Sequence, residues 1–237
     1  MNSMLMDLLK DFAGRLIDPL FNAFIQTGIK YIQEKSNISS HVFCKQSLVL
    51  GCTLEHLRTI HELGYPLSGN LFSALMKRED LSSQQKVEFL TWFQEKGIRF
   101  TSKDLVKAAK ENEVEIIEWF FERTDCAELC MDDRVVAYLA LHGHDADYID
   151  KMKERGFICT SEVMTKAAMG NQLSLMKELH ERGYHMDSRV LSFAALNDNL
   201  DMFVWATDRG LSVNQDCKTY ANIYSPSIRD HIMEEGL

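Results

Sequence analysis

The hexapeptides Met152-Lys153-Glu154-Arg155-Gly156-Phe157 and Leu179-His180-Glu181-Arg182-Gly183-Tyr184 share one pattern: an apolar residue, three polar residues, glycine, and a second apolar residue. Close variants elsewhere place the equivalent glycines at positions 64, 97, 210 and 236. The pattern is typical of a helix C-terminus, because glycine adopts the left-handed backbone conformation without a Cβ clash and the next apolar residue packs back onto the last turn. Six such phrases predict six helices that end in the same way.

The glycines are regularly spaced. Successive intervals from Gly156 to Gly183, Gly210 and Gly236 are 27, 27 and 26 residues, and Gly64 and Gly97 are 33 apart. The 59 residues between Gly97 and Gly156 fit two repeats, the first of which has lost its glycine near Arg123-Thr124-Asp125. The chain is therefore expected to be built from repeats.

A second helix is predicted before each of these helices. It opens with Ser, Thr or Asp residues that can cap an N-terminus, and it closes with two alanines and a short polar turn. The openings are Thr101-Ser102, Thr160-Ser161 and Asp187-Ser188, and the alanine pairs are 108–109, 167–168 and 194–195. A helix pair this short cannot bury its apolar faces alone, so the pairs must stack. We predict an all-α fold, a solenoid of about six or seven helix pairs over residues 41–237.

These residues resemble ankyrin repeats, in particular the short ankyrin-like repeats of giant DNA viruses of amoebae and of some protists, which often read Trp-Leu-His-Glu-x-Gly. Trp92, Trp119 and Trp205 hold one equivalent position, and His61-Glu62-Leu63-Gly64 and His180-Glu181-Arg182-Gly183 supply the other half of that phrase. The Thr-Pro-Leu-His entry of the ankyrin consensus is absent, and the period is shorter than the usual ~33 residues. The resemblance implies an ankyrin-like solenoid that binds a partner protein.

Residues 1–40 form a separate apolar segment, with Asp7, Lys10, Asp11, Arg15 and Asp18 as a narrow polar stripe between residues 4 and 32. We expect a helical cap over the first repeat, since the end of a solenoid exposes an apolar face. A docking or dimerising helix and a membrane-surface helix are the alternatives. The last would make the chain a membrane tether or host-directed effector, although its stripe is slightly acidic, whereas such helices are usually basic.

Composition excludes several classes of function. The net charge is -9 and the basic residues are scattered, so no cluster favours nucleic-acid binding. Six cysteines in a chain with a large core do not indicate a disulfide framework, which favours the cytoplasm, or the host-cell cytoplasm for a viral protein. The N-terminus is a poor secretory signal, and no apolar run reaches the ~20 residues that span a bilayer.

Candidate chemistry is sparse. Cys126, Cys130, His142 and His144 resemble a zinc ligand set, but His-x-His is shorter than the usual spacing and both histidines belong to a repeat turn. Cysteine and histidine lie one turn apart at His41/Cys44 and Cys52/His56, where a small buried thiol is the simpler interpretation. A zinc- or thiol-dependent enzyme is thus a distant alternative, and we expect no enzyme activity and no cofactor.

The leading hypothesis is a non-enzymatic module that binds a partner protein through the concave, inner-helix and connector face. The candidate contacts are residues that vary between equivalent connector positions: Arg99, Lys103, His185 and Arg189.

Overall fold

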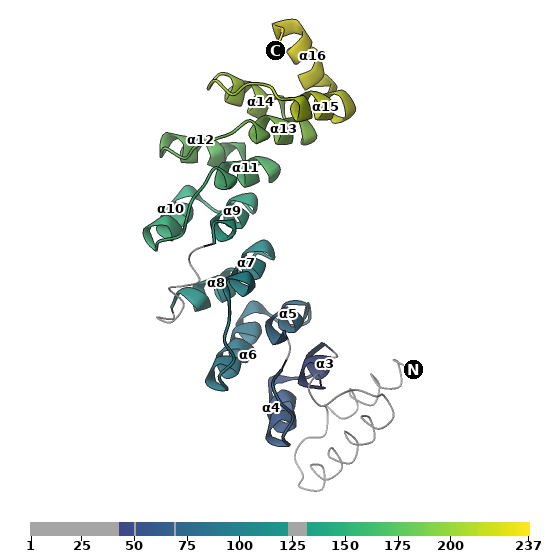
Figure 1. Ribbon diagram of the computed structural model, residues 1–237, viewed down its shortest axis with the longest axis vertical. Coiled ribbons are helices and arrows are strands. Elements are labelled where there is room, and N and C mark those ends of the chain that lie inside the picture. Colours follow the sequence, from purple (N-terminus) through teal and green to yellow (C-terminus); the bar gives the residue numbers. More distant parts are fainter. Residues whose placement is uncertain (1–42, 50, 69, 123–131) are drawn as a thin grey trace. The chain divides into compact units, whose positions relative to one another are not determined.

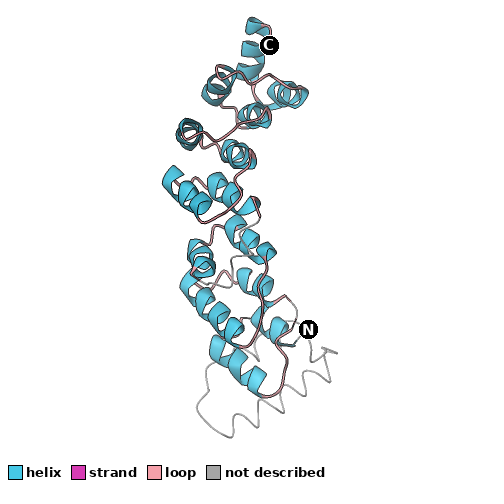
Figure 2. Cartoon of the chain, turned by 60° about the vertical axis from the view of Figure 1, so that its left-hand side comes forward, coloured by secondary structure: helices cyan, strands magenta, loops and turns pink. Residues whose placement is uncertain are grey.

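The computed structural model describes residues 43–49, 51–68, 70–122 and 132–237. Within these ranges the only regular secondary structure is α-helix (Figure 2). The predicted all-α class is confirmed for this part of the chain. The N-terminal segment 1–40, the stretch 123–125 and the candidate ligands Cys126 and Cys130 lie outside the described residues.

The chain divides into two compact units, residues 1–100 and 101–237. The described helices of the first unit are α3 (Phe43–Val49), α4 (Leu54–Glu62), α5 (Leu71–Met76) and α6 (Ser83–Glu95). Those of the second unit are α7 (Ser102–Lys110), α8 (Val114–Phe121), α9 (Arg134–Leu141), α10 (Ala146–Glu154), α11 (Glu162–Met169), α12 (Leu173–Glu181), α13 (Arg189–Leu196), α14 (Leu200–Thr207), α15 (Gln215–Tyr224) and α16 (Pro226–Glu235).

Consecutive helices pack in pairs, with the odd-numbered helix first and the even-numbered helix second (Figure 1). In residues 101–237 the first helices contact one another in chain order, α7 with α9, α9 with α11, α11 with α13 and α13 with α15. The second helices form their own row through contacts of α10 with α12 and α14 with α16. In the first unit α3 contacts α5 in the same way. Within each unit, neighbouring pairs therefore contact one another through their first helices.

The six glycine phrases end second helices as predicted. All six glycines have a positive φ, between +65° and +94°. In each phrase the amide of the apolar residue after glycine donates to the carbonyl of the apolar residue five positions earlier, as in Tyr184 to Leu179 at 3.0 Å and Phe157 to Met152 at 3.2 Å. This is the hydrogen bond of the Schellman motif, which satisfies carbonyls that the helix leaves unpaired.

The first helices end with a second left-handed residue that the sequence analysis did not identify. Asn112, Asn171, Asp198 and Gly143 have φ between +50° and +77° at equivalent positions of the polar turn. Asn and Asp tolerate this conformation better than other side-chain-bearing residues do. The next amide again donates five residues back, for example Gln172 to Ala167 at 2.9 Å. Each pair thus has two matched helix ends.

The helix starts differ in detail from the prediction. Thr101 is the N-cap residue of α7, as expected, but its side chain makes no cap bond to the helix; its backbone amide and hydroxyl both donate to Asp104 at 2.9 Å. At α11 and α13 the serine at the N-cap makes no side-chain cap bond either. The residue before each serine does this instead, since Thr160 accepts from the Glu162 amide at 3.3 Å and Asp187 from the Arg189 amide at 3.0 Å.

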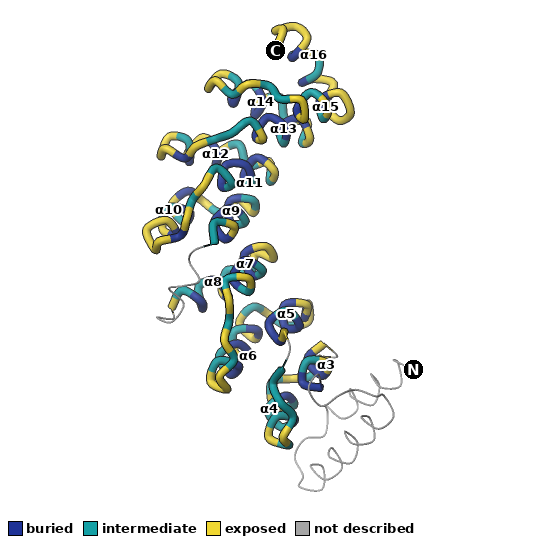
Figure 3. Tube along the Cα trace, viewed as in Figure 1, coloured by how far each residue is buried: buried dark blue, intermediate teal, exposed yellow. Residues whose placement is uncertain are grey.

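The core follows the repeat, as the buried side of each helix shows (Figure 3). The alanine pairs 108–109, 167–168 and 194–195 are fully buried, which allows close helix packing. Trp92 and Trp205 are also buried and lie edge-on against a histidine of the preceding second helix, with ring centroids 5.9 Å from His61 and 5.7 Å from His180. The recurring Trp and His residues are thus packing partners across neighbouring pairs.

Candidate interaction surface

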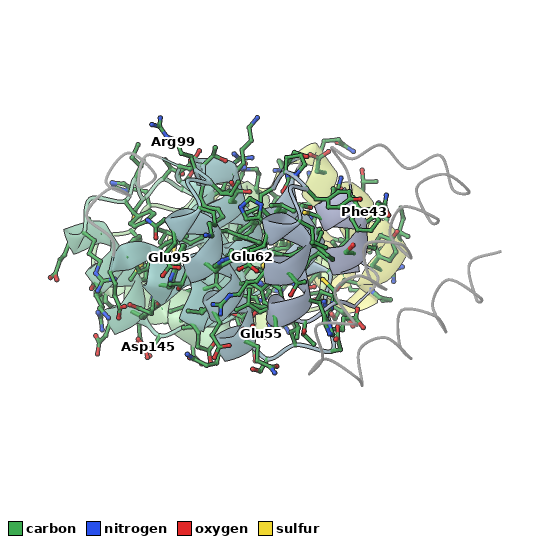
Figure 4. All side chains as sticks on the ribbon, turned by 90° about the horizontal axis from the view of Figure 1, so that it is seen from below. Phe43, Glu55, Glu62, Glu95, Arg99 and Asp145 are labelled. Atoms are coloured by element: carbon green, nitrogen blue, oxygen red, sulfur yellow. The ribbon has the colours of Figure 1, made fainter. Side chains whose placement is uncertain are left out.

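The four predicted contact residues are all exposed, each in its own setting. Arg99 follows α6, and its side chain projects away from the ribbon (Figure 4). Lys103 lies in the first turn of α7, and His185 lies in the connector between α12 and α13. Partner binding by these residues stays a prediction.

Arg189 is the exception, because its guanidinium is engaged within the chain. It binds Asp187 through two hydrogen bonds, of 3.0 and 2.7 Å, and it forms an ion pair with Glu162 of the preceding first helix. The guanidinium hydrogen bond lowers the pKa of the Asp187 carboxyl. Arg189 thus joins α11 to α13 and is less available to a partner than its exposure suggests.

His142 and His144 belong to a ladder of contacts between successive polar turns. His142 Nε2 lies 3.0 Å from the Lys110 carbonyl oxygen, and His144 Nε2 lies 2.7 Å from Asn112 Oδ1. The same relation recurs two pairs later, where the side-chain amide of Asn199 donates to Asn171 Oδ1 at 2.7 Å. Both histidines therefore have a structural partner in the preceding turn. Burial, assisted by nearby His142, lowers the pKa of His144.

Metal and thiol chemistry receive little support from the described residues. Within residues 43–49, 51–68, 70–122 and 132–237, no three His, Cys, Asp or Glu side chains are grouped closely enough to hold a metal ion. Burial raises the pKa of the Cys44 and Cys217 thiols to about 11 and that of Cys52 to about 12. These thiols are protonated at neutral pH, and the protonated form is a poor nucleophile.

Polar contacts also join the second helices to one another. Glu118 of α8 accepts from the Tyr148 hydroxyl at 2.8 Å, and Asp150 of α10 accepts from the Tyr184 hydroxyl at 2.8 Å and from Arg182 at 2.7 Å. Burial opposes the ionisation of Asp150, but the two donors outweigh it and lower its pKa. The hydroxyls of Tyr148 and Tyr184 therefore link neighbouring second helices.

The first helices carry a different feature, a row of exposed apolar side chains. Met169, Leu196 and Ile223 are 42%, 42% and 63% exposed and follow one another at intervals of 27 residues on α11, α13 and α15. Phe193 and Tyr220 lie three residues before Leu196 and Ile223, and residues three apart share one helix face. Tyr138 holds the equivalent position on α9. We call these six residues the apolar strip: Tyr138, Met169, Phe193, Leu196, Tyr220 and Ile223.

Lysines continue this surface. At the positions equivalent to Phe193 and Leu196, α7 carries Lys107 and Lys110. Lys166 lies within the strip, with Nζ 5.4 Å from the Tyr138 ring centroid and 3.5 Å from Met169 Sδ. These two distances place Tyr138, Lys166 and Met169 side by side, across α9 and α11. The surface is cationic at α7 and apolar at α13 and α15.

Charge differs between the two rows of helices in residues 101–237. The first helices carry seven Lys and Arg against three Asp and Glu, a formal charge of +4. The second helices carry four against eleven, a formal charge of -7. Among these helices the excess of acidic residues therefore lies on the second helices, and the first helices carry an excess of basic residues.

The sequence itself carries a signal for the strip. Apolar residues recur at 169 and 196, immediately after the buried alanine pairs, and at 223, two residues after the buried Ala221. A core-facing position would be buried, so an apolar residue that recurs beyond the core stripe indicates a surface with another purpose.

Comparison with known protein families found no matching family model, and comparison with curated proteins found no match. Among the helices of the described ranges, none combines the length and the apolarity needed to cross a bilayer.

Proposed function

We propose that this chain is a non-enzymatic protein-interaction module, an ankyrin-like helical-repeat solenoid that binds a partner protein through the first-helix face of residues 101–237. The observation that carries the proposal is the apolar strip, in which Met169, Leu196 and Ile223 are exposed at equal intervals on successive helices. Scattered exposed apolar residues are ordinary on a protein surface, whereas a contiguous row is typical of an interaction site.

The stacking of the helices supports a binding role. The first helices contact each other in order, so side chains at equivalent positions form rows along the stack. Repeat arrays use such extended surfaces for recognition, because each repeat contributes a few side chains at a fixed spacing. The residues that recur in the pattern have structural roles: the alanines and tryptophans are buried, and the glycines adopt the left-handed conformation at helix ends. Specificity therefore falls to the exposed positions of the first helices and the connectors.

The chemistry of the thiols fits a binding role in a reducing compartment. The cysteines Cys44, Cys52, Cys159 and Cys217 are free thiols. Free thiols persist in the cytoplasm, where glutathione and thioredoxin keep them reduced. We include that location in the proposal, and the host-cell cytoplasm if the chain is viral.

The test is affinity capture with the full chain from cells that naturally express it, followed by a binding measurement with the purified partner. The matched variants are Leu196→Asp, within the strip, and Met233→Asp, an equally simple change at a residue of α16 that is 65% exposed. We expect the partner to bind wild type and Met233→Asp alike and Leu196→Asp at least tenfold more weakly. Equal binding to all three, or no partner that binds wild type directly, would contradict the proposal.

A further inference from the structure

The surface formed by Lys107, Lys110 and the apolar strip differs in chemistry between its two ends, and this difference indicates the kind of partner that it fits. Its α7 end carries two lysines at the positions that α13 fills with Phe193 and Leu196. Lys107 forms an ion pair with Glu111 at 3.2 Å, and Lys110 is exposed at the last turn of α7. The α15 end carries Tyr220 and Ile223, the latter 63% exposed.

We propose that this surface binds an amphipathic helix with carboxylates toward one end and a row of apolar side chains toward the other, an inference that rests on the proposed function. The carboxylates would pair with the lysines of α7, and the apolar row would cover Met169, Leu196 and Ile223. Charge complementarity selects an acidic partner, since Lys107, Lys110 and Lys166 lie along this surface. A basic partner would meet like charges at α7 and Lys166, which disfavours its association.

The spacing of the stack selects a helix over an extended segment. Packed helices lie about 8–10 Å apart, so the strip offers one apolar side chain at roughly that interval. On a helix, residues seven apart lie on the same face and are about 10.5 Å apart, close to one step of the stack. In a strand, side chains on one face recur at about 6.6 Å and about 13 Å, and neither matches. A heptad of apolar residues is the pattern that fits.

The length of the partner follows from the same numbers. Five first helices, α7 to α15, are separated by four steps, roughly 32–40 Å in all. At 1.5 Å per residue this corresponds to a helix of about 21–27 residues.

The probe is a synthetic, fluorescein-labelled peptide of 25 residues with glutamates on one face of its first half and leucines at heptad spacing on the same face of its second half. A second peptide replaces the glutamates with lysines, and a third keeps the composition of the first but scrambles its order. Binding to the full chain is measured by fluorescence anisotropy at low salt. We expect the acidic peptide to bind at least tenfold more tightly than the other two.

Variants of the chain locate the site. Leu196→Asp and Ile223→Asp should each weaken binding of the acidic peptide at least tenfold, and Lys110→Glu should weaken it several-fold and reduce its salt dependence. Met233→Asp should leave binding unchanged. Circular dichroism melting checks that each variant is folded, and Lys110→Glu, at an exposed residue, keeps the test decisive if an apolar substitution unfolds the chain.

Three results would overturn the inference: no binding of the acidic peptide, equal binding of the lysine peptide, or binding that Leu196→Asp does not change. These results differ from failure of the proposed function. If the natural partner still binds wild type and is lost with Leu196→Asp while the acidic peptide fails, the strip is an interaction site but its partner is not an acidic amphipathic helix.

Discussion

Replacing Gly170 with alanine tests how closely successive first helices approach. Gly170 ends α11 with φ -80° and ψ 3°, an ordinary conformation that any residue adopts. A Cβ at this position would lie 2.1 Å from the backbone oxygen of Leu141, at the end of α9. Contacts between carbon and carbonyl oxygen ordinarily lie at about 3.3–3.6 Å, so the ends of α9 and α11 would have to separate by more than about 1 Å.

The expected cost follows from two opposing effects. Overpacking a well-filled site costs about 1–3 kcal/mol, and a clash with backbone belongs in the upper part of that range. Alanine also reduces the conformational entropy of the unfolded chain, which stabilises the variant by about 0.4–1 kcal/mol. We therefore expect Gly170→Ala to lower the free energy of unfolding by about 2 kcal/mol.

Urea unfolding followed by circular dichroism measures this loss, and Gly156 provides the control. Gly156 has φ +94° and open space around the added Cβ, so Gly156→Ala suffers only left-handed strain of roughly 1–2 kcal/mol. Asparagine tolerates that conformation, so Gly156→Asn should recover part of the loss, whereas Gly170→Asn should not. A neutral or stabilising Gly170→Ala would refute the close approach of α9 and α11.

Three further predictions address the side chains around the candidate surface. The pKa of His144, measured by NMR, should lie below 6.5, because burial and nearby His142 disfavour the charged ring. His144 should therefore make the folded chain less stable as the pH falls through 6.5. A measured pKa above 6.5 would contradict the placement of His144. Arg189→Ala should cost about 0.5–1 kcal/mol at pH 7, as expected for an exposed ion-pair network, measured by urea unfolding. Because Arg189 lowers the pKa of Asp187 below its ordinary 3.8, the stability difference between wild type and Arg189→Ala should persist above about pH 4 and shrink as the pH falls below that value. A stability difference that grows as the pH falls would contradict this ion pair. Cys44, Cys52 and Cys217 should react with a thiol reagent at pH 7.5 far more slowly in the folded chain than in urea, and equal rates would show that they are not buried.

The helix ends could be predicted from sequence because they are local. Gly183 and Tyr184 specify a left-handed residue and an apolar contact within six residues, and the hydrogen bond between Tyr184 and Leu179 follows from that geometry. The left-handed Asn171 carries a weaker signal, since asparagine is also common in turns of other kinds. For this reason the second set of helix ends was missed.

The candidate surface depends on packing between pairs, which local pattern does not specify. Arg189 is charged and lies at a position where the repeats differ, so the sequence favoured it as a partner contact. Its ion pair with Glu162 forms only because α11 and α13 are neighbours in the fold, which the local sequence does not specify. Leu196 is the opposite case, because an apolar residue at helical spacing is expected to be buried in the core. Only the stacking of α11, α13 and α15 leaves it 42% exposed.

Site-specific photo-crosslinking in cells that express the chain tests most directly whether the first-helix face binds a partner. A photoreactive amino acid is placed either at Leu196, in the apolar strip, or at Lys177, an exposed residue of the second helix α12. We predict that irradiation joins a discrete protein to the chain carrying the reactive group at 196 and not to the chain carrying it at 177. Crosslinking from 177 alone would contradict the account, since the partner would then bind the acidic second-helix face.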